Sequence, residues 1–225
     1  EQLAAHEVNL RVLPPPVMVP ALIAQNIDAF IVAEPINAAG ELEAGGKVLR
    51  FTGDMWKNHP CCVVCMHEKQ IQTQPVWTQK VMNAVVEAQI YAQQHKEEVA
   101  TVLSQDGKNY IPVAANILKH AMLVYDAQRY AQPDAIVHQQ QWQNGRIDFS
   151  PWPYPSATRL LVDAMNQTLV SSNAQFLTQL DADFVVKDLV DYHFVKTAMQ
   201  HYPGWETAPG VDLEHPFERQ EVIAI

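Results

Sequence analysis

The sequence is poor in glycine, in positive charge and in long apolar runs. Its eight glycines form neither a GxGxxG nor a Walker pattern, so loops that cradle a phosphate are not indicated. Fifteen Lys and Arg stand against 25 Asp and Glu, a net charge of −10, which disfavours a nucleic-acid partner. No apolar run approaches the ~20 residues of a membrane-spanning helix. What is present is a 225-residue globular composition with 48% hydrophobic residues, enough for one large domain or two small ones.

Cysteine is also scarce, and its three copies are clustered at Cys61, Cys62 and Cys65. An odd, clustered set does not make a disulfide framework. Together with the flanking His59 and His67, the cluster could form a zinc site. The stronger interpretation is a buried, unbridged strand over residues 61–66, in which free cysteine acts as a small hydrophobic residue.

The first fifty residues alternate short apolar runs with turns and a helical stretch. Val8–Leu13 is β-prone and ends at three prolines, which forbid its continuation. A short helix is expected over Val17–Gln25, and Asp28–Ala33 and Lys47–Phe51 are expected strands. Such alternation favours a parallel α/β sheet. Ligands of open α/β sheets bind outside the carboxyl ends of the strands, so the polar residues after Ala33 indicate a small-ligand site.

The pattern changes to helical spacing at Pro75, where an amphipathic helix of about 19 residues is predicted. Further helices are expected over Asp134–Trp142, Ser156–Leu169 and Phe184–Met199. The tail from Pro203 has no clear period and is expected to wrap a surface.

Several segments, in this order and spacing, resemble the solute-binding proteins of ABC transporters, in the nitrate/bicarbonate group related to the sulfonate and taurine binders. They are the PPPVMV stretch Pro14–Val19, the IDAFIVAEPIN stretch Ile27–Asn37, the DMWKNHP stretch Asp54–Pro60, the helix from Pro75 and the NGRIDF stretch Asn144–Phe149. Together they cover most of residues 7–165.

This resemblance implies an α/β, periplasmic-binding-protein-like (type II) fold of two lobes that close on a small anion. The chain is expected to be incomplete at its N-terminus, with a helix-rich C-terminal half. Residues 1–55 would be part of the second lobe, residues 56–202 the remainder of the first lobe, and residues 203–225 a C-terminal tail. The rest of the first lobe is expected in a missing N-terminal portion, with a separate chain as one of the alternatives.

Glu34 and Asn37 follow the second expected strand and are candidate ligand-binding residues. Glu34 could orient a ligand donor, bind a cation or pair with Lys57 across the hinge; alternatively, its charge caps the next helix. Asn37 could donate to an oxyanion or satisfy the helix start, and the second role is preferred.

Lys57 is the stronger candidate for ligand binding, because an anion site needs a cation and an ammonium group donates three hydrogen bonds. Trp56 beside it would form a wall of the pocket with its indole. The resemblance implies that this segment faces the cleft. The alternative is an ordinary exposed loop lysine.

The backbone N–H groups of Val17 and Met18 are the last candidates for ligand binding, since a helix N-terminus can bind an anion. The sequence is equally compatible with a purely structural role for these residues at the start of the helix. No catalytic set, metal site or cofactor is expected, because the histidines are scattered and no nucleophile elbow is present.

The leading interpretation is the solute-binding component of an ABC importer that captures a nitrate-, bicarbonate- or sulfonate-like oxyanion by hinge closure. Its expected partners are the permease subunits, and its expected location is periplasmic or membrane-anchored and extracytoplasmic, any export signal having been removed or lost. Two alternatives stay open: a cytoplasmic anion sensor on the same scaffold, which the free cysteines favour, and an enzyme similar to those of thiamine-precursor synthesis.

Overall fold

The computed structural model describes residues 8–167 and 172–224, and within them the regular structure is helical. The helices are α1 (Pro15–Ile23), α2 (Ile36–Glu43), α3 (Thr52–Met55), α4 (Glu68–Thr73), α5 (Pro75–Gln94), α6 (Lys96–Leu103), α7 (Ala115–Leu123), α8 (Gln139–Trp142), α9 (Pro155–Gln167), α10 (Ala182–Leu189) and α11 (Tyr192–His201). Two 3₁₀ helices, η1 (Ser172–Gln179) and η2 (Trp205–Thr207), complete the set. Within these residues, no helix combines the length and the apolar character needed to cross a bilayer.

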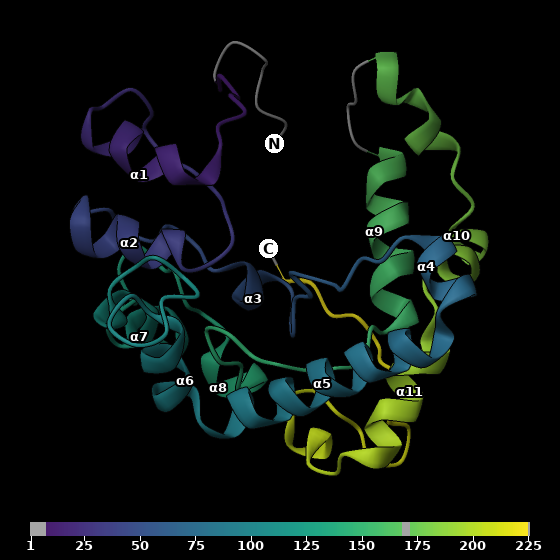
Figure 1. Cartoon of the computed structure of the whole chain (residues 1–225). Coiled ribbons are helices and arrows are strands. Elements are labelled where there is room, and N and C mark those ends of the chain that lie inside the picture. Colours follow the sequence, from purple (N-terminus) through teal and green to yellow (C-terminus); the bar gives the residue numbers. More distant parts are fainter. Residues whose placement is uncertain (1–7, 168–171, 225) are drawn as a thin grey trace.

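The helices form two groups at opposite sides of an arch (Figure 1). On one side, α1 packs on α2, α2 on α7, and α7 on α6. On the other side, α5 packs on α11 and α9 on α10, with α4 beside α5. The long helix α5 runs along the base of the arch and leads into α6, so the two groups share one rigid element.

The expected α/β sheet is not confirmed. The four expected strands, residues 8–13, 28–33, 47–51 and 61–66, lie outside the helices and form no ladder; within the described residues the β-pairing is an isolated antiparallel bridge between Trp56 and Ile223. Their apolar side chains are largely exposed: 90% of Leu10 and 78% of Ile31 face solvent. An apolar, β-prone run becomes a strand only when a neighbouring backbone satisfies its N–H and C=O groups.

The cysteine prediction is half right. Cys61, Cys62 and Cys65 are free, as expected, but all three are exposed rather than buried in a strand. The cause is the missing sheet, because a strand side chain is covered only when the sheet and its packing layer exist. No group of three or more potential metal ligands occurs among the described residues.

The helix predicted from Pro75 is confirmed. It is the 20-residue α5, with proline in its first turn, where the missing N–H costs nothing. The helix expected over Ser156–Leu169 is α9, and residues 168 and 169 lie outside the described part of the chain.

Two other helix predictions are wrong in length. Residues 184–199 are divided between α10 and α11, because Asp191 caps a new helix by accepting a hydrogen bond from the backbone N–H of His193. The helix expected over residues 134–142 is reduced to α8. The carboxylate of Asp54 binds the backbone N–H groups of Val137 and His138, both at 2.8 Å, and so holds the preceding residues outside a helix.

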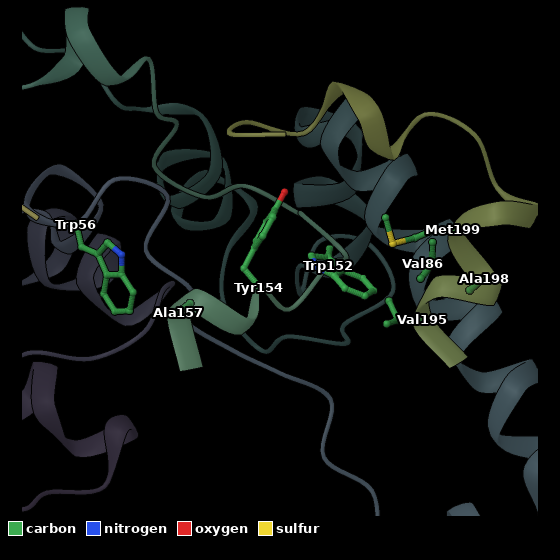
Figure 2. Packing of buried hydrophobic residues seen from close by; sticks show 8 residues of the cluster. All are labelled: Trp56, Val86, Trp152, Tyr154, Ala157, Val195, Ala198 and Met199. Carbon is green, nitrogen blue, oxygen red and sulfur yellow. The ribbon is translucent and has the colours of Figure 1, made fainter. Parts of the chain in front are cut away.

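The largest apolar cluster joins α5, α9 and α11 with the segment after α3 (Figure 2). Its buried members are Trp56, Val86, Trp152, Tyr154, Ala157, Val195, Ala198 and Met199. The tail contributes Phe217, whose ring lies 4.6 Å from that of Trp152. The tail is therefore part of the core of this side, and its isolated bridge to Trp56 joins it to the segment after α3.

Candidate functional site

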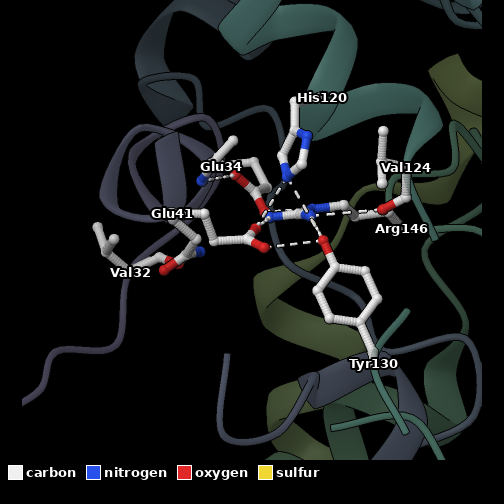
Figure 3. Close-up of polar contacts among 9 residues, drawn as sticks. Val32, Glu34, Glu41, His120, Val124, Tyr130 and Arg146 are labelled. Atoms are coloured by element: carbon white, nitrogen blue, oxygen red, sulfur yellow. Dashed lines mark hydrogen bonds and ion pairs between the residues drawn. The ribbon is translucent and has the colours of Figure 1, made fainter. Parts of the chain in front are cut away.

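Arg146 occupies the centre of a buried ionic cluster between α2 and α7 (Figure 3). Its Nε donates to Glu34 Oε1 at 2.8 Å, and its Nη2 donates to Glu41 Oε2 at 2.6 Å. The arginine side chain is 1% exposed. Burial disfavours the charge on Arg146, but the carboxylates of Glu34 and Glu41 outweigh burial and raise the pKa of the guanidinium.

Two further side chains complete the cluster. The hydroxyl of Tyr130 donates to Glu41 Oε1 at 2.9 Å and accepts from Nη1 of Arg146 at 2.8 Å. Nε2 of His120 lies 3.2 Å from Glu41 Oε2. Burial, together with the bond to Glu41, raises the pKa of Tyr130 to about 12 despite the opposing charge of Arg146. With two carboxylates around one guanidinium, the cluster does not favour an added anion.

Glu34 thus has structural partners. Besides Arg146, its Oε2 accepts the backbone N–H of Ala38 at 3.0 Å in the first turn of α2, which agrees with the capping alternative. Asn37 donates its side-chain amide to the carbonyl of Val32, a contact that fixes the start of the helix. The ligand roles proposed for Glu34 and Asn37 remain predictions, and the described contacts join neither residue to Trp56 or Lys57.

Trp56 and Lys57 lie at the end of α3, beside the tail. The indole Nε1 of Trp56 donates to Glu221 Oε2 at 2.6 Å, and the ring of His59 meets the indole edge-on at 5.2 Å between centroids. The backbone N–H of Lys57 donates to the carbonyl of Val222 at 3.0 Å. The Lys57 side chain is half-buried, and its ammonium forms no ion pair with any described residue. The anion role of Lys57 stays a prediction.

Asp54 holds the turn that carries Trp56 and Lys57 in place. Its side chain is 1% exposed and lies 3.1 Å from Nη2 of Arg50, in addition to the two backbone N–H groups that it accepts from the loop before α8. The side-chain amide of Asn144 donates to the carbonyl of Gly53. These contacts hold the turn that presents Trp56 and Lys57, so they place the candidate cation without touching it.

Val17 and Met18 lie in the first turn of α1, which begins at Pro15. The backbone N–H of Val17 already donates to the carbonyl of Pro14 at 3.0 Å. That N–H is therefore engaged in the helix entry, and the anion role of Val17 and Met18 stays a prediction.

Sequence reasoning did not assign roles to Glu41, Arg146, Arg219 or Glu221, and it considered Ser156 only as a helix cap. Arg146 was visible only as part of the resemblance stretch Asn144–Phe149. Glu41 and Tyr130 are 89 positions apart, and Glu221 lies 65 and 165 positions from Ser156 and Trp56, so no local pattern reveals these contacts. The pairing of Arg219 with Glu221 spans only two positions.

Comparison with known proteins finds a family match over part of the chain. Residues 2–104, a little under half of the chain, match the NMT1-like family. This match confirms the resemblance to the nitrate/bicarbonate group of ABC solute-binding proteins, and a periplasmic-binding-protein-like fold is what that family implies.

Particular relatives agree with this class. The chain is 33% identical to the nitrate/nitrite binding protein NrtA of Nostoc sp. over 117 residues, which are 51% of this chain and 26% of that protein. It is 31% identical to the NrtA of Synechococcus elongatus over 103 residues, 45% and 23% of the two chains. It is 35% identical to the nitrate import ATP-binding protein NrtC of Synechocystis sp. over 100 residues, 44% and 15% of the two. The matches thus span about a quarter or less of these relatives. No solved structure matches the chain.

Proposed function

We propose that this chain is the anion-recognising part of an extracytoplasmic solute-binding component of an ABC importer. Its ligand would be a small oxyanion of the nitrate, bicarbonate or sulfonate kind, captured by hinge closure and delivered to permease subunits. The observation that carries the proposal is the similarity to three proteins named nitrate/nitrite binding protein. A further relative, of Synechocystis sp., is named a bicarbonate transport ATP-binding protein.

The positive charge of Lys57 also supports the proposal. The chain carries a net charge of −10, so an anion needs a local cation that is not already neutralised. Within the described residues, Lys57 has no acidic partner, while Arg146 is held between two carboxylates. In a closed, water-poor cleft such an ammonium attracts an anion more strongly than it does in bulk water.

Titration calorimetry of the chain with sodium nitrate, bicarbonate and taurine tests this function. We expect heat of binding with at least one of the three, and weaker binding by about 10- to 100-fold in Lys57→Ala, the equivalent of one charge-assisted hydrogen bond. Lys80→Ala is the matched control, because Lys80 is exposed on α5 and has no ion pair among the described residues. No heat with any of these anions would contradict the function, and equal affinities of the two variants would remove Lys57 from the site.

A further inference from the structure

Glu221 sits in a ring of hydrogen-bond donors supplied by three separate parts of the chain. Its Oε1 accepts from Ser156 Oγ at 2.7 Å and from Arg219 Nε at 2.9 Å. Its Oε2 accepts from Trp56 Nε1 at 2.6 Å and from Arg219 Nη2 at 3.0 Å. We call Trp56, Ser156 and Arg219 the carboxylate cradle.

The carboxylate cradle is a built anion site rather than a surface ion pair. The side chains of Arg219 and Glu221 are 11% and 8% exposed, and the guanidinium lies 4.4 Å from the ring centre of Tyr154. A guanidinium binds a planar oxyanion through two parallel N–H donors. An indole N–H and a hydroxyl add two donors without adding any acceptor that repels negative charge in this geometry.

Tyr154, the aromatic neighbour of Arg219, carries a buried polar group. The hydroxyl of Tyr154 is buried and has no hydrogen-bond partner, and the residue itself is 3% exposed. A buried hydroxyl without a partner is unusual in folded proteins. The ring of Tyr154 stacks against the guanidinium of Arg219 and so lies beside the carboxylate cradle.

Glu221 reaches the cradle on a tail segment that is held by its backbone. Lys57 N–H donates to Val222, and the N–H of Ala224 donates to the carbonyl of Met55 at 2.8 Å. The backbone of the tail is therefore paired independently of the Glu221 side chain. The unpaired Lys57 follows Trp56 directly in the chain.

We propose that the carboxylate cradle is a binding site for a trigonal, singly charged oxyanion, and that Glu221 fills it as an internal ligand that a free anion must displace. Nitrate, bicarbonate and a carboxylate share a planar arrangement of oxygens about a central atom, so each can take the donors that Glu221 now uses. The identity of the natural anion rests on the proposed function, whereas the cradle itself rests only on the geometry above.

Nuclear magnetic resonance of the indole N–H groups tests the proposal. The chain has five tryptophans, and Trp56→Phe assigns the resonance of Trp56. Sodium nitrate or sodium acetate is added at constant ionic strength, with chloride as the replaced anion, and acetamide serves as the neutral analogue of acetate. We expect the Trp56 indole signal of Glu221→Ala to shift with nitrate and acetate but not with acetamide.

The wild-type chain should need about tenfold more of either anion for the same shift, since Glu221 competes for the same donors. Arg219→Gln in the Glu221→Ala background should weaken the response by a similar factor. An unresponsive Trp56 signal in Glu221→Ala, or equal responses in Glu221→Ala and wild type, would overturn the proposal. If Glu221→Ala does not fold, Glu221→Gln keeps the shape of the side chain without its charge, and it should respond at lower anion concentrations than wild type.

The two proposals fail differently. If the calorimetry finds no ligand but acetate shifts the Trp56 signal in Glu221→Ala, the carboxylate cradle stands and the transport function falls. If Lys57-dependent binding of nitrate is found but the Trp56 signal of the Glu221 variants does not respond, the function stands and the anion binds elsewhere.

Discussion

Arg146 and Glu34 are 112 positions apart in the sequence, and their side chains meet at 2.8 Å in the interior. The same guanidinium also binds Glu41, so one residue neutralises two carboxylates that are 13% and 11% exposed. This arrangement attaches the loop before α9 to both ends of α2 and fixes the geometry of that side of the arch.

Replacement of Arg146 by methionine should therefore destabilise the chain strongly. It leaves two buried carboxylates without a cation, a change that costs about 3–5 kcal/mol in other buried ion pairs. Urea unfolding followed by circular dichroism measures the change. Arg159→Met is the control, because Arg159 forms an exposed ion pair with Asp183 and its loss should have little effect; equal losses in the two variants would contradict the structural role of the cluster.

Tyr130 makes stability depend on alkaline pH. Its folded pKa is raised to about 12, mainly by burial, whereas an unfolded tyrosine ionises near 10. Between these values the unfolded chain has lost a proton that the folded chain retains, so stability falls as pH rises from about 10 to 12. In Tyr130→Phe this decline should be shallower, while the exposed Tyr110→Phe should show the wild-type slope. Thermal unfolding from pH 9 to 12 compares the slopes, and an unchanged slope in Tyr130→Phe would contradict the prediction.

Val86 is fully buried where α5 meets α11. Val86→Ala removes two methyl groups from this contact, and the lost burial plus the cavity should cost about 2–3 kcal/mol. Val76 on the same helix is 71% exposed, so Val76→Ala should stay within about 0.5 kcal/mol of wild type. Denaturant unfolding of both variants provides the comparison, and a neutral Val86→Ala would mean that α5 and α11 are not packed as described.

All three cysteines should be accessible to a thiol reagent, but they should react at different rates. All three are exposed, so Ellman's reagent at pH 8 should modify three thiols of the folded chain. Partial burial of its sulfur and the neighbouring Cys62 thiol raise the pKa of Cys61 to about 11, and since the thiolate is the reactive form, Cys61 should react slowly. Cys61→Ser should remove the slow phase; thiols that react only in denaturant would restore the buried-strand interpretation.

The sequence predicted local features better than distant ones. Helix α5 was visible because proline at a helix start and apolar residues at helical spacing act within one segment. The capping role of Glu34 was visible for the same reason, since its acceptor contact with Ala38 spans four positions. The extended segments were recognised as β-prone, but the formation of a sheet depends on partner backbones, which no single segment encodes.

The candidate site was predictable only in part. Trp56 and Lys57 stood in a family-like stretch, so they could be proposed in advance. The partner of Trp56 could not, because Glu221 lies 165 positions away in a tail without periodicity. Likewise, nothing near Arg146 in the sequence indicates that its charge is neutralised by α2.

The return of the tail to Trp56 has a consequence for how the chain loses its structure. Phe217 is embedded among the aromatic rings of one side, with Trp152 and Trp205 as its neighbours, while residues 222–224 are hydrogen-bonded to the segment after α3. The tail thus ties the segment after α3 non-covalently to the aromatic core around α5 and α11. Disruption of that core releases the tail from the segment after α3, so this core and the segment should lose their structure in one cooperative transition rather than independently.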